Sequence, residues 1–367
     1  MEPGRRTPID TVDTDRYLRV TISAAVLAVL AVAEAPNPAR ADEGGVSFWV
    51  PGIYASLAAV PLQPGWTVNE TYYHWQGEGG ADVAAAREIT IGRFNPTLGV
   101  NLSGNLFALA DLVFGTAIYT FEQPVLGGQA SVGLLAAYGR TDATVNATLS
   151  GTLGPIPFGP FMRQDYGEAT GFSDLYPQAT LRWNKGVDNY MVYITGDIPV
   201  GLYNPSDLAN IGIGHGAIDA GGAYTYFNPQ TGHEFSVTSG LTYNFLNPST
   251  QYQNGIDAHL DWGASQFLTK QFQIGAVGYV YQQLTCDSGS GDKVGCFESR
   301  VLGIGPQIGF IFPIETPFGI KQAYLNLRGY GEFDHENRAQ GWDTWLSLTI
   351  SNPAPTPPPA THPMVYK

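Results

Sequence analysis

Charged residues are scarce in this chain of 367 residues, and basic residues are the scarcer kind. Charged side chains make up 14% of the sequence, against about 25% in an ordinary soluble domain. The 18 Lys and Arg are outnumbered by 32 Asp and Glu, and the net charge is −14. Binding of nucleic acid requires clustered basic residues that neutralise phosphates, so we expect no nucleic-acid partner. The excess of acids fits a surface or a pore lined with carboxylates.

Cysteine and histidine are also too few or too scattered for most kinds of site. The two cysteines, Cys286 and Cys296, lie ten residues apart with no histidine nearby. A zinc site requires more ligands at closer spacing, so we predict a disulfide that closes an exposed loop of an exported chain. Asp257, His259 and Asp261 share one face of a predicted strand, but about 7 Å separates successive members. Since no G-x-S-x-G elbow occurs either, we predict no enzyme, no cofactor and no metal.

Only one long apolar run is present, at residues 20–33. Arg16 and Arg19 precede it, and the small-residue pattern Ala39-Arg40-Ala41 follows it. This order of charged, apolar and small residues is typical of a secretory signal peptide. The run is shorter than the roughly 20 residues of a membrane helix. We therefore predict that residues 1–41 are a cleaved signal peptide, with a single membrane anchor as the alternative.

Glycine and proline are abundant, with 45 and 26 residues, which argues against a helical bundle. From Gly65 to Ile350, apolar and polar residues alternate with a period of two. This is the period of a β-strand, whose successive side chains point to opposite faces. A soluble sandwich has the same local pattern. However, the segments here run for 9–14 residues, which is near the length of a membrane strand, about 9–11 residues, and above the usual 5–6.

Aromatic residues and loop lengths favour a membrane barrel over the sandwich. Short turns alternate with six longer polar connections, at 76–87, 149–168, 201–213, 246–254, 284–298 and 333–341. Tyrosine and tryptophan stand near segment ends, as in the aromatic girdles of outer-membrane barrels: Trp66, Tyr73, Trp75, Tyr190, Tyr330 and Trp342. We predict an all-β fold, a transmembrane antiparallel β-barrel of about 12 strands over residues 65–351. Ten or fourteen strands remain alternatives, and residues 352–367 form a proline-rich tail.

Several segments together resemble a known family. They are DLYP at 174–177, TGDIPVG at 195–201, FNPQTGHEFS at 227–236, YQNGIDAHLDWGASQF at 252–267, GIGPQIGFIFP at 303–313 and PGIYASLAAVPLQPGW at 51–66. As a set, they resemble the outer-membrane transporters grouped under the meta-cleavage pathway of phenol degradation. The resemblance implies a barrel in the outer membrane of a Gram-negative bacterium that admits hydrophobic or aromatic compounds. It also implies contact with lipid, lipopolysaccharide and the barrel-assembly machinery, and it supplies no catalytic residues.

The polar face of the predicted strands then lines a lumen. Its charged members are Asp174, Arg182, Asp197, Asp219, Glu234, Asp257, His259, Asp261 and Asp343. One interpretation is a mostly anionic conduit that repels anions and tolerates cations or neutral solutes. The alternative is a hydrogen-bonded network that fills a narrow barrel and holds its shape. In both cases we expect Arg182 to pair with a carboxylate, because an unpaired charge in a confined lumen is costly.

Residues 42–64 are apolar, contain three prolines and do not alternate. We predict that this segment folds into the barrel as a plug, with Phe48, Trp49 and Tyr54 contacting an aromatic solute. The alternative is a periplasmic segment packed under the barrel. The predicted function is passive outer-membrane transport of small hydrophobic or aromatic compounds. A general diffusion pore with mild cation preference and a structural barrel with a closed lumen are the alternatives.

Overall fold

The computed structural model describes residues 47–80, 83, 100–153, 156–292, 295–296 and 298–353. All of them belong to one unit, Ala39–Lys367. The predicted signal peptide, residues 42–46 and the tail beyond residue 353 lie outside this range. Within it, no helix combines the length and the apolar composition needed to cross a membrane.

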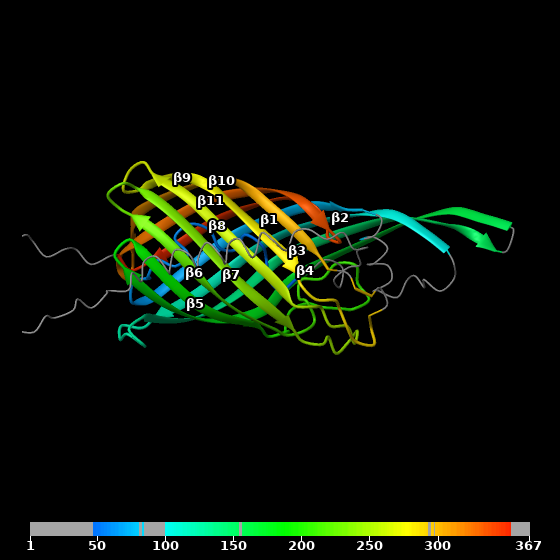
Figure 1. Cartoon of the computed structure of the whole chain (residues 1–367), viewed down its shortest axis with the longest axis horizontal. Helices are drawn as coiled ribbons and strands as arrows, with labels where there is room; N and C mark the ends of the chain where they lie inside the picture. The colour runs from blue at the N-terminus through cyan, green and yellow to red at the C-terminus, as the bar shows by residue number, and fades with distance from the viewer. Residues whose placement is uncertain are drawn as a thin grey trace, which may run out of the picture. The chain divides into compact units, whose positions relative to one another are not determined.

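Twelve antiparallel strands close into a barrel, in which each strand pairs with its neighbours in sequence and β1 pairs with β12 (Figure 1). The pairing of Val68 with Ile350 belongs to this closing seam. The prediction of an all-β barrel with about 12 strands is confirmed. The strands are β1 Gly65–Gly79, β2 Val100–Thr120, β3 Gln129–Leu153, β4 Ile156–Lys185, β5 Asp188–Asp197, β6 Ala217–Asn228, β7 His233–Asn244, β8 Asp257–Phe267, β9 Phe272–Gln283, β10 Arg300–Thr316, β11 Gly319–Glu336 and β12 Gln340–Ser351.

The alternating sequence gives the barrel two different walls. Along β7, Glu234 and Ser236 are buried inside, whereas Phe235 and Leu241 are exposed outside. Lipid offers the backbone no hydrogen-bond partners, so a spanning sheet must satisfy every strand edge by closing on itself. Closure and an apolar outer wall therefore go together, and the chain is an outer-membrane β-barrel.

Two predicted loops are shorter than expected because strands continue into them. The expected loop at 149–168 is largely the paired ends of β3 and β4, and β11 continues to Glu336, which leaves only residues 337–339 as the last loop. Figure 1 shows β2, β3 and β4 continuing past the rim, where the longer loops gather. Leu208 and Ala209 from the β5–β6 loop are buried with Ala143 and Val145 of β3, so a loop covers the extension. The polar side chains of these segments resemble those of a loop, but their backbones are paired as strands.

Only some of the predicted girdle residues face outward. Trp66 and Trp342 are 63% and 45% exposed, and Trp66 packs edge-on against Tyr119 at 5.2 Å between ring centroids. Tyr73 and Tyr330 are buried inside the barrel, so their assignment to the girdle was wrong. Trp75 also points inward, as its indole nitrogen donates to Glu332. Parity along the strand decides which wall a residue joins, and the residue type alone does not.

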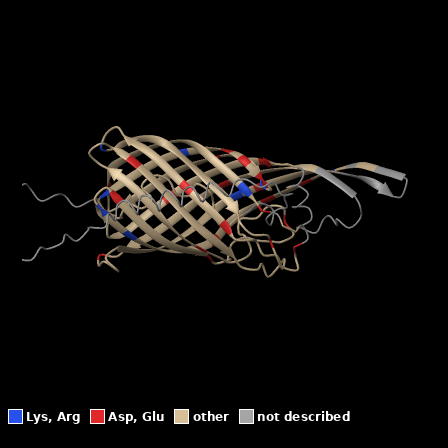
Figure 2. Ribbon diagram, in the orientation of Figure 1, with Lys and Arg blue, Asp and Glu red and all other residues tan. Residues whose placement is uncertain are grey.

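The outer wall carries an acidic residue between apolar neighbours. Figure 2 shows few charged positions along the strands away from the rims. Glu70 nevertheless lies on the exposed face of β1, between Val68 and Tyr72, and pairs across the strands with Gly115 and Leu348. No hydrogen-bond partner for its carboxylate occurs among the described residues. A charge in this position is unfavourable in lipid.

We therefore expect Glu70→Leu to raise the free energy of unfolding by about 1–3 kcal/mol, because it removes a lipid-exposed charge. The measurement is guanidinium unfolding in lipid vesicles, followed by tryptophan fluorescence. Val68→Leu, on the same wall without a change of charge, is the control and should shift the value by less than about 0.5 kcal/mol. A destabilised Glu70→Leu barrel would contradict the expectation and indicate that the carboxylate has a favourable partner.

Candidate functional site: the barrel interior

The segment before β1 runs through the interior of the barrel, where inner-wall side chains bind its backbone. The amides of Gly52 and Tyr54 donate to the carboxylate of Asp261, at 2.9 and 3.1 Å. The amide of Leu57 donates to Glu234 at 2.9 Å. Each bond joins an amide to a charged acceptor, which is stronger than a bond between neutral groups. Two of the predicted lumen acids therefore bind the segment itself.

Further bonds attach the same segment to the strands on that side of the barrel. Ala59 donates its amide to Thr225 Oγ1 at 3.0 Å. Arg328 donates to the carbonyl of Ile53 at 3.1 Å, and Gln307 donates to Ser56 Oγ at 2.6 Å. These wall residues belong to β6, β10 and β11, whereas Glu234 and Asp261 belong to β7 and β8. The segment is thus docked along one side of the interior, from β6 to β11.

Glycine is required where the segment passes closest to the wall. Gly52 has a positive φ of 84°, and a Cβ there would lie 3.1 Å from the rings of Tyr279 and Tyr330. Only glycine adopts this conformation without strain and leaves room for both rings. This contact allows the Gly52 amide to reach Asp261.

Trp49 occupies the middle of the interior, 5% exposed. Its ring stacks on the imidazole of His259, with 3.5 Å between centroids and 13° between planes. His259 Nε2 lies 2.9 Å from Asp219 Oδ2, and neither side chain is exposed. Thr242 donates to the same Asp219 oxygen at 2.6 Å. The orientation of Trp49 is therefore set by a buried polar pair on the wall.

Two cavities lie in the interior. The loop-side cavity, of about 250 Å³, is bounded by residues of the long loops and the adjoining strand ends, among them Leu112, Leu208, Ile211 and Glu332. The turn-side cavity, of about 310 Å³, reaches the ends of β1 and β12 beside the short turns, with Thr67, Thr349 and Gln178. Five residues line both cavities and form an apolar partition between them: Phe48, Trp49, Val50, Phe114 and Tyr176. All but Phe114 and Tyr176 come from the segment.

The predicted lumen residues are all buried. Their exposed fractions do not exceed 8%: Asp174, Arg182, Asp197, Asp219, Glu234, Asp257, His259, Asp261 and Asp343. Most of these carboxylates accept hydrogen bonds, as Asp174 does from the amides of Gly201 and Ile213 at 2.7 and 2.8 Å. Asp343 accepts from Tyr279 and Trp345. Asp197 differs, since neither of its oxygens has a partner among the described residues.

Arg182 does not pair with a carboxylate, contrary to expectation. Its guanidinium donates to Thr180 Oγ1 at 2.5 Å, its Nε has no partner, and no ion pair of the described residues includes it. Three carboxylates of the inner wall already have other partners. Asp261 and Glu234 accept hydrogen bonds from the segment, and Asp219 lies beside His259. Arg182 instead lines the turn-side cavity.

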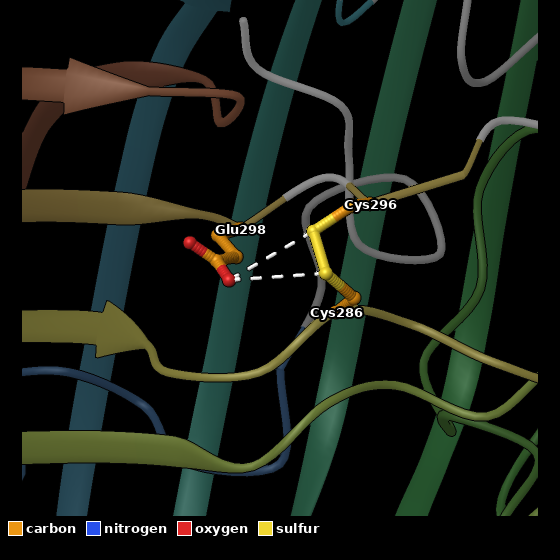
Figure 3. A group of neighbouring side chains, drawn as sticks. All are labelled: Cys286, Cys296 and Glu298. Atoms are coloured by element: carbon orange, nitrogen blue, oxygen red, sulfur yellow. Dashed lines mark hydrogen bonds between the residues drawn. A yellow bond between two sulfur atoms is a disulfide. The ribbon is translucent and has the colours of Figure 1, made fainter. Parts of the chain in front are cut away.

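Asp257, His259 and Asp261 each contact a different partner, and they do not converge on one metal site. Asp257 accepts from Asn244 at 2.8 Å, while His259 and Asp261 bind as described above. In the described part of the chain, the one group of three potential metal-ligating residues close together is Cys286, Cys296 and Glu298 (Figure 3). Its two cysteines form a disulfide, which confirms the predicted pairing. Without thiolates, this group lacks the ligands of a soft-metal site.

Next to the disulfide, Asp287 joins two long loops. It accepts from Tyr252 OH at 2.6 Å, the Gly255 amide at 3.0 Å and Gln283 Nε2 at 2.7 Å. Burial raises the pKa of the Asp287 carboxyl above its ordinary value, although these three bonds lower it. The bonds hold the β7–β8 and β9–β10 loops together at the loop end of the barrel.

Phe114, Tyr176 and Arg328 were not among the predicted site residues, although all three line a cavity. Their inward parity was readable from the alternation, since Arg328 shares its parity with Asn326 and Tyr330. Nothing in the sequence indicated that they meet the segment before β1, because those contacts join residues far apart in the chain.

A closed twelve-strand barrel with an apolar outer wall defines the class of outer-membrane β-barrels. The family described as "Putative MetA-pathway of phenol degradation" matches residues 91–348, and the chain belongs to this family. An outer membrane channel from Pseudomonas putida F1 has a similar fold, with a TM-score of 0.57 and 12% identity over 79% of this chain and 97% of that one. A FadL homologue from Pseudomonas aeruginosa aligns less well, with a TM-score of 0.36 and 10% identity over 78% and 89%. None of the curated proteins compared matches the chain.

Proposed function

We propose that this barrel is a passive outer-membrane transporter for small hydrophobic or aromatic compounds, and that residues 47–64 are its plug. The observation that carries the proposal is the pair of cavities separated by an apolar partition. Membership of a family described by phenol degradation supports the solute class. We also propose that the chain has no enzymatic activity, and that lipopolysaccharide and the barrel-assembly machinery are partners of its outer surface.

The dimensions of the cavities suit a small ring compound. An apolar protein cavity of about 150 Å³ is large enough to bind benzene, and both cavities here exceed that volume. Phe48, Trp49 and Tyr54 line at least one of them, as an aromatic contact requires. Aromatic rings favour offset or edge-on contact with such side chains.

The partition is the proposed gate. From Gly52 to Ala59 the segment is hydrogen-bonded to the wall, whereas the described contacts of Phe48–Val50 with the wall are ring contacts, such as Trp49 on His259. Rearrangement of Phe48 and Trp49 then costs less than release of the whole plug. A solute passes the partition by displacing these two side chains, with Gly52–Ala59 still docked.

Uptake by whole cells separates this function from its alternatives. A strain without the gene is expected to grow more slowly on a limiting aromatic compound, and the gene should restore growth. Vesicles that contain the purified protein should remain tight to sugars. Leakage of unrelated sugars with a size limit would favour the general diffusion pore. Absence of any passage in both assays would favour a structural barrel and remove the transport proposal.

A further inference from the structure

Two buried arginines face the turn-side cavity without an acidic partner. Arg182 and Arg328 are 6% and 7% exposed, and both line this cavity. Arg182 donates to Thr180, while Arg328 donates to Asn326 and to the Ile53 carbonyl. The Nε of each has no hydrogen-bond partner, and no carboxylate of the described residues forms an ion pair with either.

Three other arginines of the described residues form ion pairs, although they are more exposed. Arg140 binds Asp142 and Glu168, Arg163 binds Asp165, and Arg300 binds Asp334 and Glu336. An exposed charge gains little from such a pair, whereas a buried charge without one is costly. The guanidinium of Arg328 lies over the Trp345 ring, 4.9 Å from its centroid, and this contact partly compensates its charge. Arg182 has no such ring contact among the described residues. It therefore lies where pairing matters most, which indicates that its counter-charge comes from outside the chain.

The lining of the turn-side cavity contains no acid. Among its residues, Arg182 and Arg328 are the charged ones, and the rest are hydroxyl, amide, aromatic and aliphatic side chains. The loop-side cavity differs, since Asp142 and Glu332 accompany Arg338 there. A chain with a net charge of −14 thus has one interior space in which the described charges are positive. This charge favours a bound anion.

We propose that the turn-side cavity binds a small organic acid, a carboxylate attached to an apolar or aromatic group. Arg182, together with Gln178, supplies donors for the carboxylate, and the planar guanidinium fits a carboxylate with two parallel hydrogen bonds. Tyr54 and Leu135 supply the apolar surface for the rest of the molecule. This inference rests on the proposed transport function and adds the charge of the solute to it.

The test compares benzoate with benzyl alcohol, its neutral counterpart of similar size, on the full-length protein in detergent. Binding is measured by calorimetry, and entry into vesicles is measured in parallel. We expect benzoate to bind the natural protein more tightly than benzyl alcohol. Arg182→Met should weaken benzoate binding by about tenfold or more, because it removes charge-assisted hydrogen bonds. It should change benzyl alcohol binding by less than about twofold.

Three further variants complete the experiment. Arg163→Met makes the same change of charge at an exposed position of β4 outside the turn-side cavity, and it should leave benzoate binding unaltered. Arg182→Lys keeps the charge without the planar fork and should retain part of the affinity. Arg182→Gln has the same expected loss as Arg182→Met and replaces it if that variant does not assemble.

The outcomes separate the two proposals. Equal binding of benzoate by Arg182→Met and the natural protein would overturn the organic-acid site, even if benzyl alcohol enters vesicles faster with the protein than without it. Equal affinity for inorganic phosphate and benzoate would overturn the assignment to an organic acid. If neither benzoate nor benzyl alcohol entered vesicles with the protein faster than vesicles without it, the transport function itself would be contradicted.

Discussion

Deletion of residues 47–60 is expected to raise the conductance of the barrel severalfold in planar bilayers. Barrels of eight strands are filled by side chains, and those of 16–18 strands leave an aqueous channel. A twelve-strand barrel lies between these cases, so a segment inside it decides whether water and ions pass. The deletion removes Phe48, Trp49 and Val50, which belong to the partition, and the backbone that Asp261 and Glu234 bind.

The control is deletion of residues 354–367, which has the same length and follows the last strand. It should leave the conductance unchanged. Trp49→Ala supplies an independent readout, because it opens the partition without removing backbone, and it should raise the conductance less than the deletion does. Unchanged conductance after loss of residues 47–60 would contradict the proposal that this segment is a plug.

Asp261→Leu is expected to lower the free energy of unfolding by about 2–6 kcal/mol. The substitution leaves two buried amides, those of Gly52 and Tyr54, without an acceptor, and each unsatisfied buried group costs about 1–3 kcal/mol. Asp261→Asn keeps one acceptor oxygen and should cost less. The measurement is guanidinium unfolding in vesicles, with protease cleavage within residues 47–64 as a second readout of undocking.

Asp197→Leu is a matched control, since Asp197 is also a buried acid on the inner wall. Its carboxylate oxygens accept no hydrogen bond from the described residues. Its replacement should therefore leave stability unchanged or raise it, because a buried charge without partners is unfavourable. Equal destabilisation by both substitutions would show that the acids act through burial or volume rather than by binding the segment.

The alternation of residues along the chain determined more of this protein than any motif did. A period of two predicts two walls, and long segments without a membrane helix predict that the apolar wall faces lipid. The strand number followed from the alternation of short turns and long connections. The same parity placed nine charged residues on the polar face, and all nine are buried. Where residue type was used instead of parity, as for Tyr73 and Tyr330, the prediction failed.

Only the tertiary structure decided what the inward residues do. Leu57 and Glu234 are 177 residues apart, and Gly52 and Asp261 are 209 apart, so local patterns contain no sign of their hydrogen bonds. These hydrogen bonds occupy two carboxylates, Asp261 and Glu234, which belonged to the set expected to pair with Arg182 or to repel anions. Arg182 consequently lines the turn-side cavity, whose lining contains no acidic residue. Parity selects the wall on which a side chain lies, but closure of the barrel around its own N-terminal segment selects the partner.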